Sequence, residues 1–273
     1  MEIMGMNTLE LPPIERPIQE SLQPPVMAAM THQGLIREDN QDAFIIDPDG
    51  RFAIVADGMG GHEGGALASR TASAAVAAAL DHPFDDDRHD ALAEKWLRTG
   101  FGEAFEALSA KALKNPDCGD MGTTLLATAF CRHDGELVVA HLGDSRLYRL
   151  RDGRLTQLTD DHNVLAELRR AGVLNEETEA ENHHLAHLLT RAVSPGATDR
   201  PDIFRAQTHP GDRYLLCSDG LHGVVAHDKI ATLLGQDCDL ETICQDLIDA
   251  SLDGGAPDNV TVALLDFAKA QDA

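Results

Sequence analysis

Short apolar segments separated by turn signals recur along this chain and constrain its fold more than any other feature. Each of three segment pairs is separated by an Asp-Gly turn: AFIID and RFAIV, TTLLATAFC and ELVVAHLG, and SRLYRL and RLTQL. Asp-Gly between two strand-like segments favours a tight hairpin, so we predict mainly antiparallel strands. Two later strands are predicted in RYLLCS and NVTVALLDF.

Three segments between these strand groups have helical character: residues 65–80, 90–113 and 239–252. The first is rich in Ala with larger residues at helical spacing, and the third places apolar side chains on one face after Asp239, a suitable N-cap. Strands cluster before and after the helices instead of alternating with them. This order predicts an α+β fold.

The chain has 273 residues, and we predict one domain over residues 26–268. Residues 1–25 contain five prolines among polar residues and no sustained periodicity, which predicts a flexible Pro-rich leader. Residues 163–189 are amphipathic, charged and interrupted by Gly172, so we predict a helical flap between strands. Residues 269–273 are expected to form a short tail.

The net charge is strongly negative: 22 Lys and Arg against 46 Asp and Glu give −24 at pH 7. Such a charge repels nucleic acid and anionic membranes and attracts cations and basic polypeptides. The five cysteines form no C-x-x-C pair, which is typical of a reducing compartment. No apolar segment approaches the roughly 20 residues that cross a bilayer. We therefore expect a cytoplasmic monomer with neither nucleic-acid nor membrane partners.

Four aspartates stand at the ends of predicted buried strands. Asp57 and Asp219 each end an apolar run and precede a glycine without a returning strand, Asp144 closes LVVAHLGD, and Asp258 opens NVTVALL. A carboxylate there is costly unless a cation or hydrogen-bond donors meet it. If the four gather at one site, their all-oxygen ligation favours Mg²⁺ or Mn²⁺. Alternatively, they are separate turns and caps.

Arg37 and Asp42 precede a predicted strand and suggest what such a metal site would do. A lone arginine is usually a solvated surface charge, but beside two metal ions its planar fork can hold two phosphate oxygens. Two ions roughly 3.5 to 4 Å apart can lower the pKa of a water and direct it at phosphorus. The reaction class indicated is phosphomonoester hydrolysis.

Eight segments occur in a recognisable order: REDNQDA (37–43), VADGMGGHEGG (55–65), MGTTLL (121–126), AHLGDSRLYRL (140–150), LTDDHN (158–163), LLTRAV (188–193), GDRYLLCSDGL (211–221) and DNVTVALL (258–265). This series resembles the type 2C metal-dependent protein serine/threonine phosphatase family, especially its compact bacterial members. The resemblance implies a four-layer α-β-β-α sandwich of two antiparallel sheets flanked by helices. It also implies a metal cluster at one end of the sandwich.

The resemblance assigns metal-binding roles to positions of this sequence. It implies that Asp57 bridges two metal ions and that the carbonyl of Gly58 binds one of them. It implies that Asp219 and Asp258 hold the other ion. Asp144 and Asp219 match the positions that bind a third, weaker ion in bacterial relatives.

The resemblance also implies supporting roles for three residues, and the sequence departs from the family pattern at one position. Arg37 matches the phosphate clamp, Asp42 a carboxylate that orients the attacking water, and Asn259 a residue that supports the metal ligands. Met59 stands where some eukaryotic relatives have a histidine proposed as general acid. His62 is a nearby candidate proton donor, although a hydrogen-bonded loop histidine is the better interpretation.

The implied activity is Mg²⁺- or Mn²⁺-dependent hydrolysis of phosphoserine and phosphothreonine in proteins. A metal-activated water attacks directly in this family, so no phosphoenzyme is expected. The implied partners are phosphoproteins and a bacterial serine/threonine kinase whose action the enzyme opposes. Two alternatives remain at this point: a metal-dependent phosphatase of small phosphoesters, and an inactive phosphatase-like binding module.

Overall fold

The computed structural model describes residues 22–61, 63–81, 87–174 and 183–267. Several predictions fall outside these ranges: residues 1–21 of the leader, His62, residues 175–182 of the flap, and the tail. Within the described ranges, none of the helices combines the length and the apolar composition that a membrane crossing requires.

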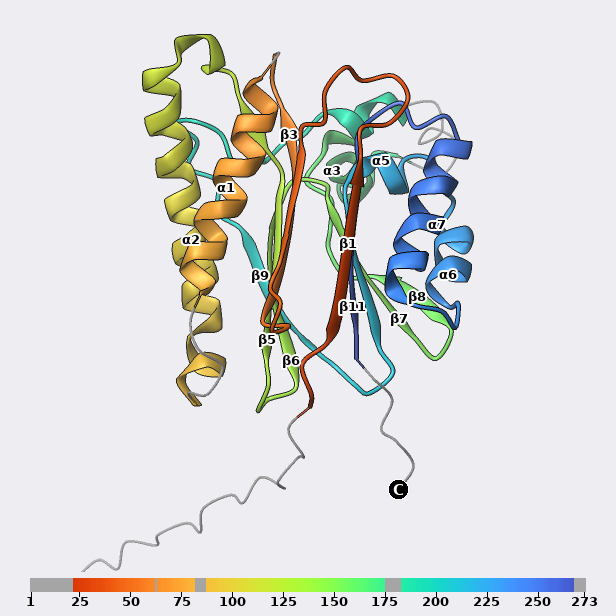
Figure 1. The fold of residues 1–273 in the computed structure, drawn as a ribbon. Helices are drawn as coiled ribbons and strands as arrows, with labels where there is room; N and C mark the ends of the chain where they lie inside the picture. The colour runs from red at the N-terminus through yellow and green to blue at the C-terminus, as the bar shows by residue number, and fades with distance from the viewer. Residues whose placement is uncertain (1–21, 62, 82–86, 175–182, 268–273) are drawn as a thin grey trace, which may run out of the picture.

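Eleven strands lie in the described ranges and form two antiparallel sheets (Figure 1). The first sheet has the order β1-β11-β10-β7-β8, with β1 Val26–His32, β7 Arg146–Arg151, β8 Arg154–Gln157, β10 Arg213–Cys217 and β11 Val260–Asp266. The second has the order β2-β3-β5-β6-β9, with β2 Asp42–Ile46, β3 Phe52–Met59, β5 Leu125–Cys131, β6 Glu136–Leu142 and β9 Asp202–Gln207. The short β4, Gly122–Thr123, pairs with β3.

Helices cover the outer faces of both sheets (Figure 1). The second sheet is covered by α1 Gly64–Leu80 and α2 Asp87–Lys114, and the first sheet by α6 His227–Leu234 and α7 Leu240–Asp253. Shorter helices connect these layers: η1 Pro116–Cys118, α3 Val164–Arg170, η2 His183–His187 and α5 Asp219–His222. The predicted α+β fold, a four-layer sandwich with helices on both sides, is confirmed.

The hydrophobic core occupies three layers: one beneath α1 and α2, one between the sheets, and one beneath α6 and α7. A central strand therefore contacts apolar groups on both faces. In β3, the five residues Phe52–Ala56 are all buried. Helix packing on one face and sheet packing on the other explain why this strand is continuously apolar, whereas a half-exposed strand alternates.

The Asp-Gly pairs divide as the sequence predicts. Gly50, Gly135 and Gly153 have φ values of 76°, 61° and 74° and lie in the turns of three hairpins. By contrast, β3 continues past Asp57 to Met59, and Asp219 begins α5 after β10. The first three pairs are turns, and the last two place carboxylates at one end of the sandwich.

Candidate metal centre

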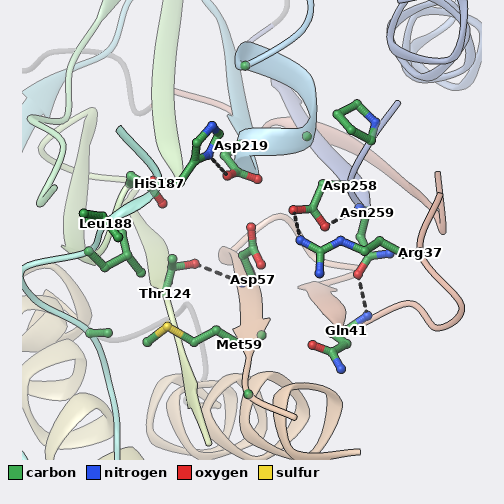
Figure 2. A pocket seen from close by; sticks show the side chains of 18 of the residues that line it. Arg37, Gln41, Asp57, Met59, Thr124, His187, Leu188, Asp219, Asp258 and Asn259 are labelled. Carbon is green, nitrogen blue, oxygen red and sulfur yellow. Dashed lines mark hydrogen bonds and ion pairs between the residues drawn. The ribbon is translucent and has the colours of Figure 1, made fainter. Parts of the chain in front are cut away.

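A cleft of about 1290 Å³ opens at one end of the sandwich (Figure 2). Its walls include Arg37, Asp57, Asp144, Asp219 and Asp258, residues that lie far apart in the sequence. The structure therefore brings the predicted site residues together instead of distributing them among separate turns and caps.

Antiparallel pairing explains why these strand ends meet. In the second sheet, Asp42 at the start of β2 lies opposite Asp57 near the end of β3. In the first sheet, Asp219 follows the end of β10 and Asp258 precedes the start of β11, and these two strands are antiparallel neighbours. Each sheet thus contributes one pair of carboxylates to the same end of the molecule.

The backbone of Asp57 is held by two threonines of the MGTTLL segment. The Asp57 N–H donates to Thr124 Oγ1 at 2.9 Å, and the Asp57 carbonyl accepts from Thr124 N at 2.8 Å and from Thr123 Oγ1 at 2.9 Å. The hydroxyls of Thr124 and Ser145 are 2.7 Å apart, beside Asp144. Thr124 therefore links the strand that carries Asp57 to the loop that carries Asp144.

Asp42 is buried at the interface between the sheets. Its Oδ2 accepts hydrogen bonds from Ser218 Oγ at 2.8 Å, directly after β10, and from Thr261 Oγ1 at 2.6 Å, in β11. Burial raises the pKa of Asp42 to about 7, although the two hydroxyls oppose the rise. Asp42 thus joins the sheets, and its buried Oδ1 has no hydrogen-bond partner among the described residues.

Asn259 supports the loop of residues 33–41. Its Nδ2 donates to the carbonyls of Gln33 at 2.8 Å and Asp39 at 2.9 Å, and its Oδ1 accepts from the N–H of Gln41 at 2.8 Å (Figure 2). These three bonds satisfy the full amide group and fix the loop that carries Arg37.

Arg37 lies at the exposed side of the cleft. Its Nη2 is 2.6 Å from Asp258 Oδ2, and its side chain is 55% exposed (Figure 2). A half-exposed guanidinium beside the carboxylate cluster can still offer N–H groups to an incoming anion. This placement agrees with a phosphate-binding role, which stays a prediction.

The carboxylates raise one another's pKa values because they are buried together. Burial, followed by the charge of Asp42, raises the pKa of Asp57 well above its usual range. Burial and the charge of Asp219 raise the pKa of Asp144 to about 8. The pKa of Asp219 is raised by burial and then by the charge of Asp258. The cluster therefore favours the arrival of positive charge.

The chemistry of this cluster fits a divalent cation. Besides Asp42 Oδ1, Asp219 Oδ1 is buried and has no donor among the described residues. The carboxylates offer oxygen atoms, the ligands that Mg²⁺ and Mn²⁺ prefer. At Gly58, a Cβ atom would collide with the backbone carbonyls of Gly65 and Gln41. The close packing at Gly58 leaves room for backbone only.

We expect Gly58→Ala to lower the free energy of unfolding by about 1–3 kcal/mol, because the added methyl must displace backbone atoms. Gly61→Ala is the matched control, since a Cβ atom at Gly61 meets nothing within 4 Å. Urea unfolding of both variants measures the difference. Equal unfolding midpoints for the two variants would contradict this account of Gly58.

A second group of possible ligands, His141, His162 and Asp202, has its ligand atoms within 4.8 Å of one another. Here a guanidinium already supplies the positive charge: Arg191 Nη2 is 2.9 Å from Asp202 Oδ1. The N–H of Gly143 donates to His162 Nδ1 at 3.1 Å, and His162 Nε2 lies 3.0 Å from Asp202 Oδ2 and 2.8 Å from Arg191 Nη1. We interpret this group as a clamp between the Asp144 loop, the flap and β9.

Two histidines need separate comment. His62, the candidate proton donor, lies outside the described residues. His187, which the sequence analysis missed, lines the cleft with Nδ1 3.8 Å from Asp219 Oδ2 (Figure 2). In the segment HHLAHLL, no local pattern distinguishes His187 from its neighbours, so only the fold identifies it.

Comparisons with known proteins agree with this architecture. The family model described as protein phosphatase 2C matches residues 28–252. The serine/threonine protein phosphatase PstP of Mycobacterium tuberculosis is 39% identical over 239 residues, covering 88% of this chain and 44% of that protein. A serine/threonine phosphatase of Listeria welshimeri is 34% identical, covering 86% of this chain and 93% of that protein. This chain thus spans less than half of the mycobacterial relative and nearly all of the listerial one.

A solved structure of the PstP catalytic domain, in complex with two manganese ions, is 37% identical and has a TM-score of 0.76. The match covers 89% of this chain and 98% of the chain in that solved structure. The fold, two sheets covered by helices, and the cluster of carboxylates at one end of it are typical of a protein that binds divalent metal ions. The chain belongs to the protein phosphatase 2C family.

Proposed function

We propose that this protein is a Mg²⁺- or Mn²⁺-dependent phosphatase that hydrolyses phosphoserine and phosphothreonine in proteins. The observation that carries the proposal is the convergence of Asp57, Asp219 and Asp258 with Arg37 in one cleft. Membership of the phosphatase 2C family supports it, as does the manganese complex of a relative.

We propose the following ligands for two metal ions and a third, weaker one. Asp57 bridges the two core ions, the Gly58 carbonyl binds one of them, and Asp219 and Asp258 hold the other. Asp144 and Asp219 hold the third ion. When bound, the ions neutralise the carboxylates and activate a water for attack on phosphorus. The raised pKa values of Asp57, Asp144 and Asp219 support this assignment, because buried carboxylates that repel one another favour binding of positive charge.

The remaining residues bind and orient the reactants in this proposal. Arg37 holds two oxygens of the phosphate, in exchange for its contact with Asp258. Asn259 keeps the Arg37 loop in place through its three hydrogen bonds. Asp42 orients the attacking water with the oxygen that the hydroxyls of Ser218 and Thr261 leave available. Displacement is direct, without a phosphoenzyme.

Phosphate release from a phosphothreonine peptide tests this function. We expect release in the presence of Mn²⁺, loss of activity in EDTA and recovery when Mn²⁺ is restored, because the carboxylates cannot bind or activate the reactants without the ions. Activity that survives EDTA would refute the metal mechanism. Hydrolysis of small phosphoesters alone would favour the small-ester alternative, and tight Mn²⁺ binding without any phosphate release would favour the binding module.

We also propose the setting in which the enzyme acts. Its substrates are phosphoproteins, and it opposes a serine/threonine kinase. The net charge of −24 favours basic partners. Residues 26–268 act as one catalytic domain, a proposal supported by the pairing of β1 with β11 near the two ends of this range, and the domain acts as a monomer. The five free cysteines support a reducing compartment such as the cytoplasm.

A further inference from the structure

His187 is the last residue of η2 and reaches into the cleft from the flap. Figure 2 shows it on one side of Asp219, with Asp258 and Arg37 on the other side. Its Nδ1 is 3.8 Å from Asp219 Oδ2, and the two side chains are 64% and 21% exposed. At this separation the two atoms form no direct hydrogen bond, which requires about 3.2 Å or less.

A distance of 3.8 Å suits two atoms that bind the same metal ion. Ligand atoms lie about 2.0–2.2 Å from Mg²⁺ or a first-row metal ion, so two ligands of one ion are separated by at most about 4.4 Å. The other oxygen of this carboxylate, Asp219 Oδ1, has no donor among the described residues. Asp144 lines the same cleft and shares the third ion with Asp219 in the proposed function.

The backbone around His187 is anchored to the base of the flap. The N–H of Val164 donates to the Leu188 carbonyl at 2.9 Å, and the N–H of Thr190 donates to the His162 carbonyl at 2.9 Å. Asn163 and Leu189 form a β-bridge between these two bonds. The residues that follow His187 are therefore held in place beside the cleft.

We propose that His187 Nδ1 is a ligand of the metal ion shared by Asp144 and Asp219, and that this nitrogen makes the position prefer Mn²⁺ to Mg²⁺. Mg²⁺ is a hard ion that takes oxygen ligands, whereas transition-metal ions accept imidazole nitrogen. The inference rests on the metal site of the proposed function and does not depend on the substrate. It assigns the flap a role in metal selection.

Pulsed electron paramagnetic resonance of the Mn²⁺-loaded full chain tests the nitrogen ligand directly. We expect a ¹⁴N coupling to Mn²⁺ in the wild type, its loss in His187→Ala and its loss in Asp144→Asn, which removes a carboxylate from the shared ion. His184→Ala is the matched control, because His184 belongs to the same short helix and is exposed. This control is expected to keep the coupling.

Calorimetric titration with each metal tests the preference. In His187→Ala, the affinity of the weakest Mn²⁺ site is expected to fall about 10- to 100-fold, as for other changes in metal-binding residues. The affinity for Mg²⁺ is expected to stay within a factor of about 2 of the wild type, because oxygen ligands dominate Mg²⁺ binding. Equal losses for Mn²⁺ and Mg²⁺ would contradict the predicted selectivity.

A ¹⁴N coupling that persists in His187→Ala would overturn the inference, as would its absence from wild-type protein with three Mn²⁺ ions bound. Phosphate release from the phosphothreonine peptide, measured on the same samples, separates this result from the proposed function. If the coupling is lost in His187→Ala but the wild type releases no phosphate, the proposed function is refuted and His187 is supported as a metal ligand. Phosphatase activity in a wild-type protein that shows no ¹⁴N coupling would support the function and refute His187 as a ligand.

Discussion

Replacing Asp57 with Asn is expected to lower kcat for Mn²⁺-dependent phosphate release about 10³-fold or more. Asp57 is the proposed bridge between the core ions, and its backbone is fixed by Thr123 and Thr124, so no neighbouring carboxylate can take its position. Loss of one metal-bridging charge removes several kcal/mol of transition-state stabilisation, and each 1.4 kcal/mol is about tenfold in rate. Steady-state kinetics with a phosphothreonine peptide measures the change.

The same substitution is expected to have the opposite effect on the stability of the metal-free protein. Asn cannot ionise, so the folded protein no longer buries this carboxylate among others that repel it, and the melting temperature in EDTA should rise. In Mn²⁺ the wild type should become the more stable form, because ligand at 100 times Kd adds about 2.7 kcal/mol to the folded state. Thermal unfolding with EDTA and with Mn²⁺ measures both effects.

Asp253→Asn is the matched control for this pair of measurements, because Asp253 is exposed at the end of α7, outside the cleft. It should leave both the activity and the Mn²⁺-dependent stabilisation unchanged. If Asp57→Asn lowered the melting temperature equally with and without Mn²⁺, Asp57 would be a packing residue and the bridging assignment would be wrong.

The carboxylate cluster is expected to make the metal-free protein less stable as the pH rises from about 4 to about 8, against the opposite contribution of His162 and His222, whose pKa values burial lowers. Burial raises the pKa of Asp42 to about 7 and that of Asp144 to about 8, against an ordinary value of 3.8. Between these limits Asp42 and Asp144 bind more protons in the folded state than in the unfolded state. The stabilisation from each group is therefore complete when the pH is below its pKa in the unfolded state. It falls by about 1.4 kcal/mol per pH unit as the pH rises toward the pKa of the group in the folded state.

Saturating Mn²⁺ should largely remove this pH dependence near neutral pH, because the ions replace the protons that the carboxylates otherwise retain. Urea unfolding across the same pH range, in EDTA and in Mn²⁺, measures the two slopes. Asp42→Asn in EDTA should give a shallower slope than the wild type, since one of the titrating groups is gone. Identical slopes in EDTA and Mn²⁺ would show that the carboxylates do not bind the ion.

Much of the fold was predictable because local signals agree with it. Asp49-Gly50 lies between two strand-like segments and forms a turn, whereas Asp57-Gly58 ends an apolar run and lies within the end of β3. Asp239 was predicted as an N-cap, and its side chain accepts from Thr242 N at 2.8 Å. These features depend on residues close in sequence, so pattern and structure coincide.

Several contacts of the site were not predictable, because their partners are distant in sequence. Ser218 lies 176 residues from Asp42, and its hydroxyl meets the Asp42 carboxylate only when the two sheets pack together. Thr124, which precedes β5, likewise contacts Asp57 in β3 and Ser145 after β6 only when these strands are paired in the sheet. Serine and threonine are common throughout the chain, so their sequence positions indicate no particular partner.

By itself the sequence determined the antiparallel strands, their turns and the carboxylates that end them, because hydrophobic periodicity and turn chemistry act over a few residues. Only the tertiary structure decided which groups face one another in the cleft: Asp42 with its two hydroxyl donors, and His187 beside Asp219. Those neighbours depend on how two sheets and a flap pack. Packing depends on the shape of the whole core, which no short segment of sequence contains.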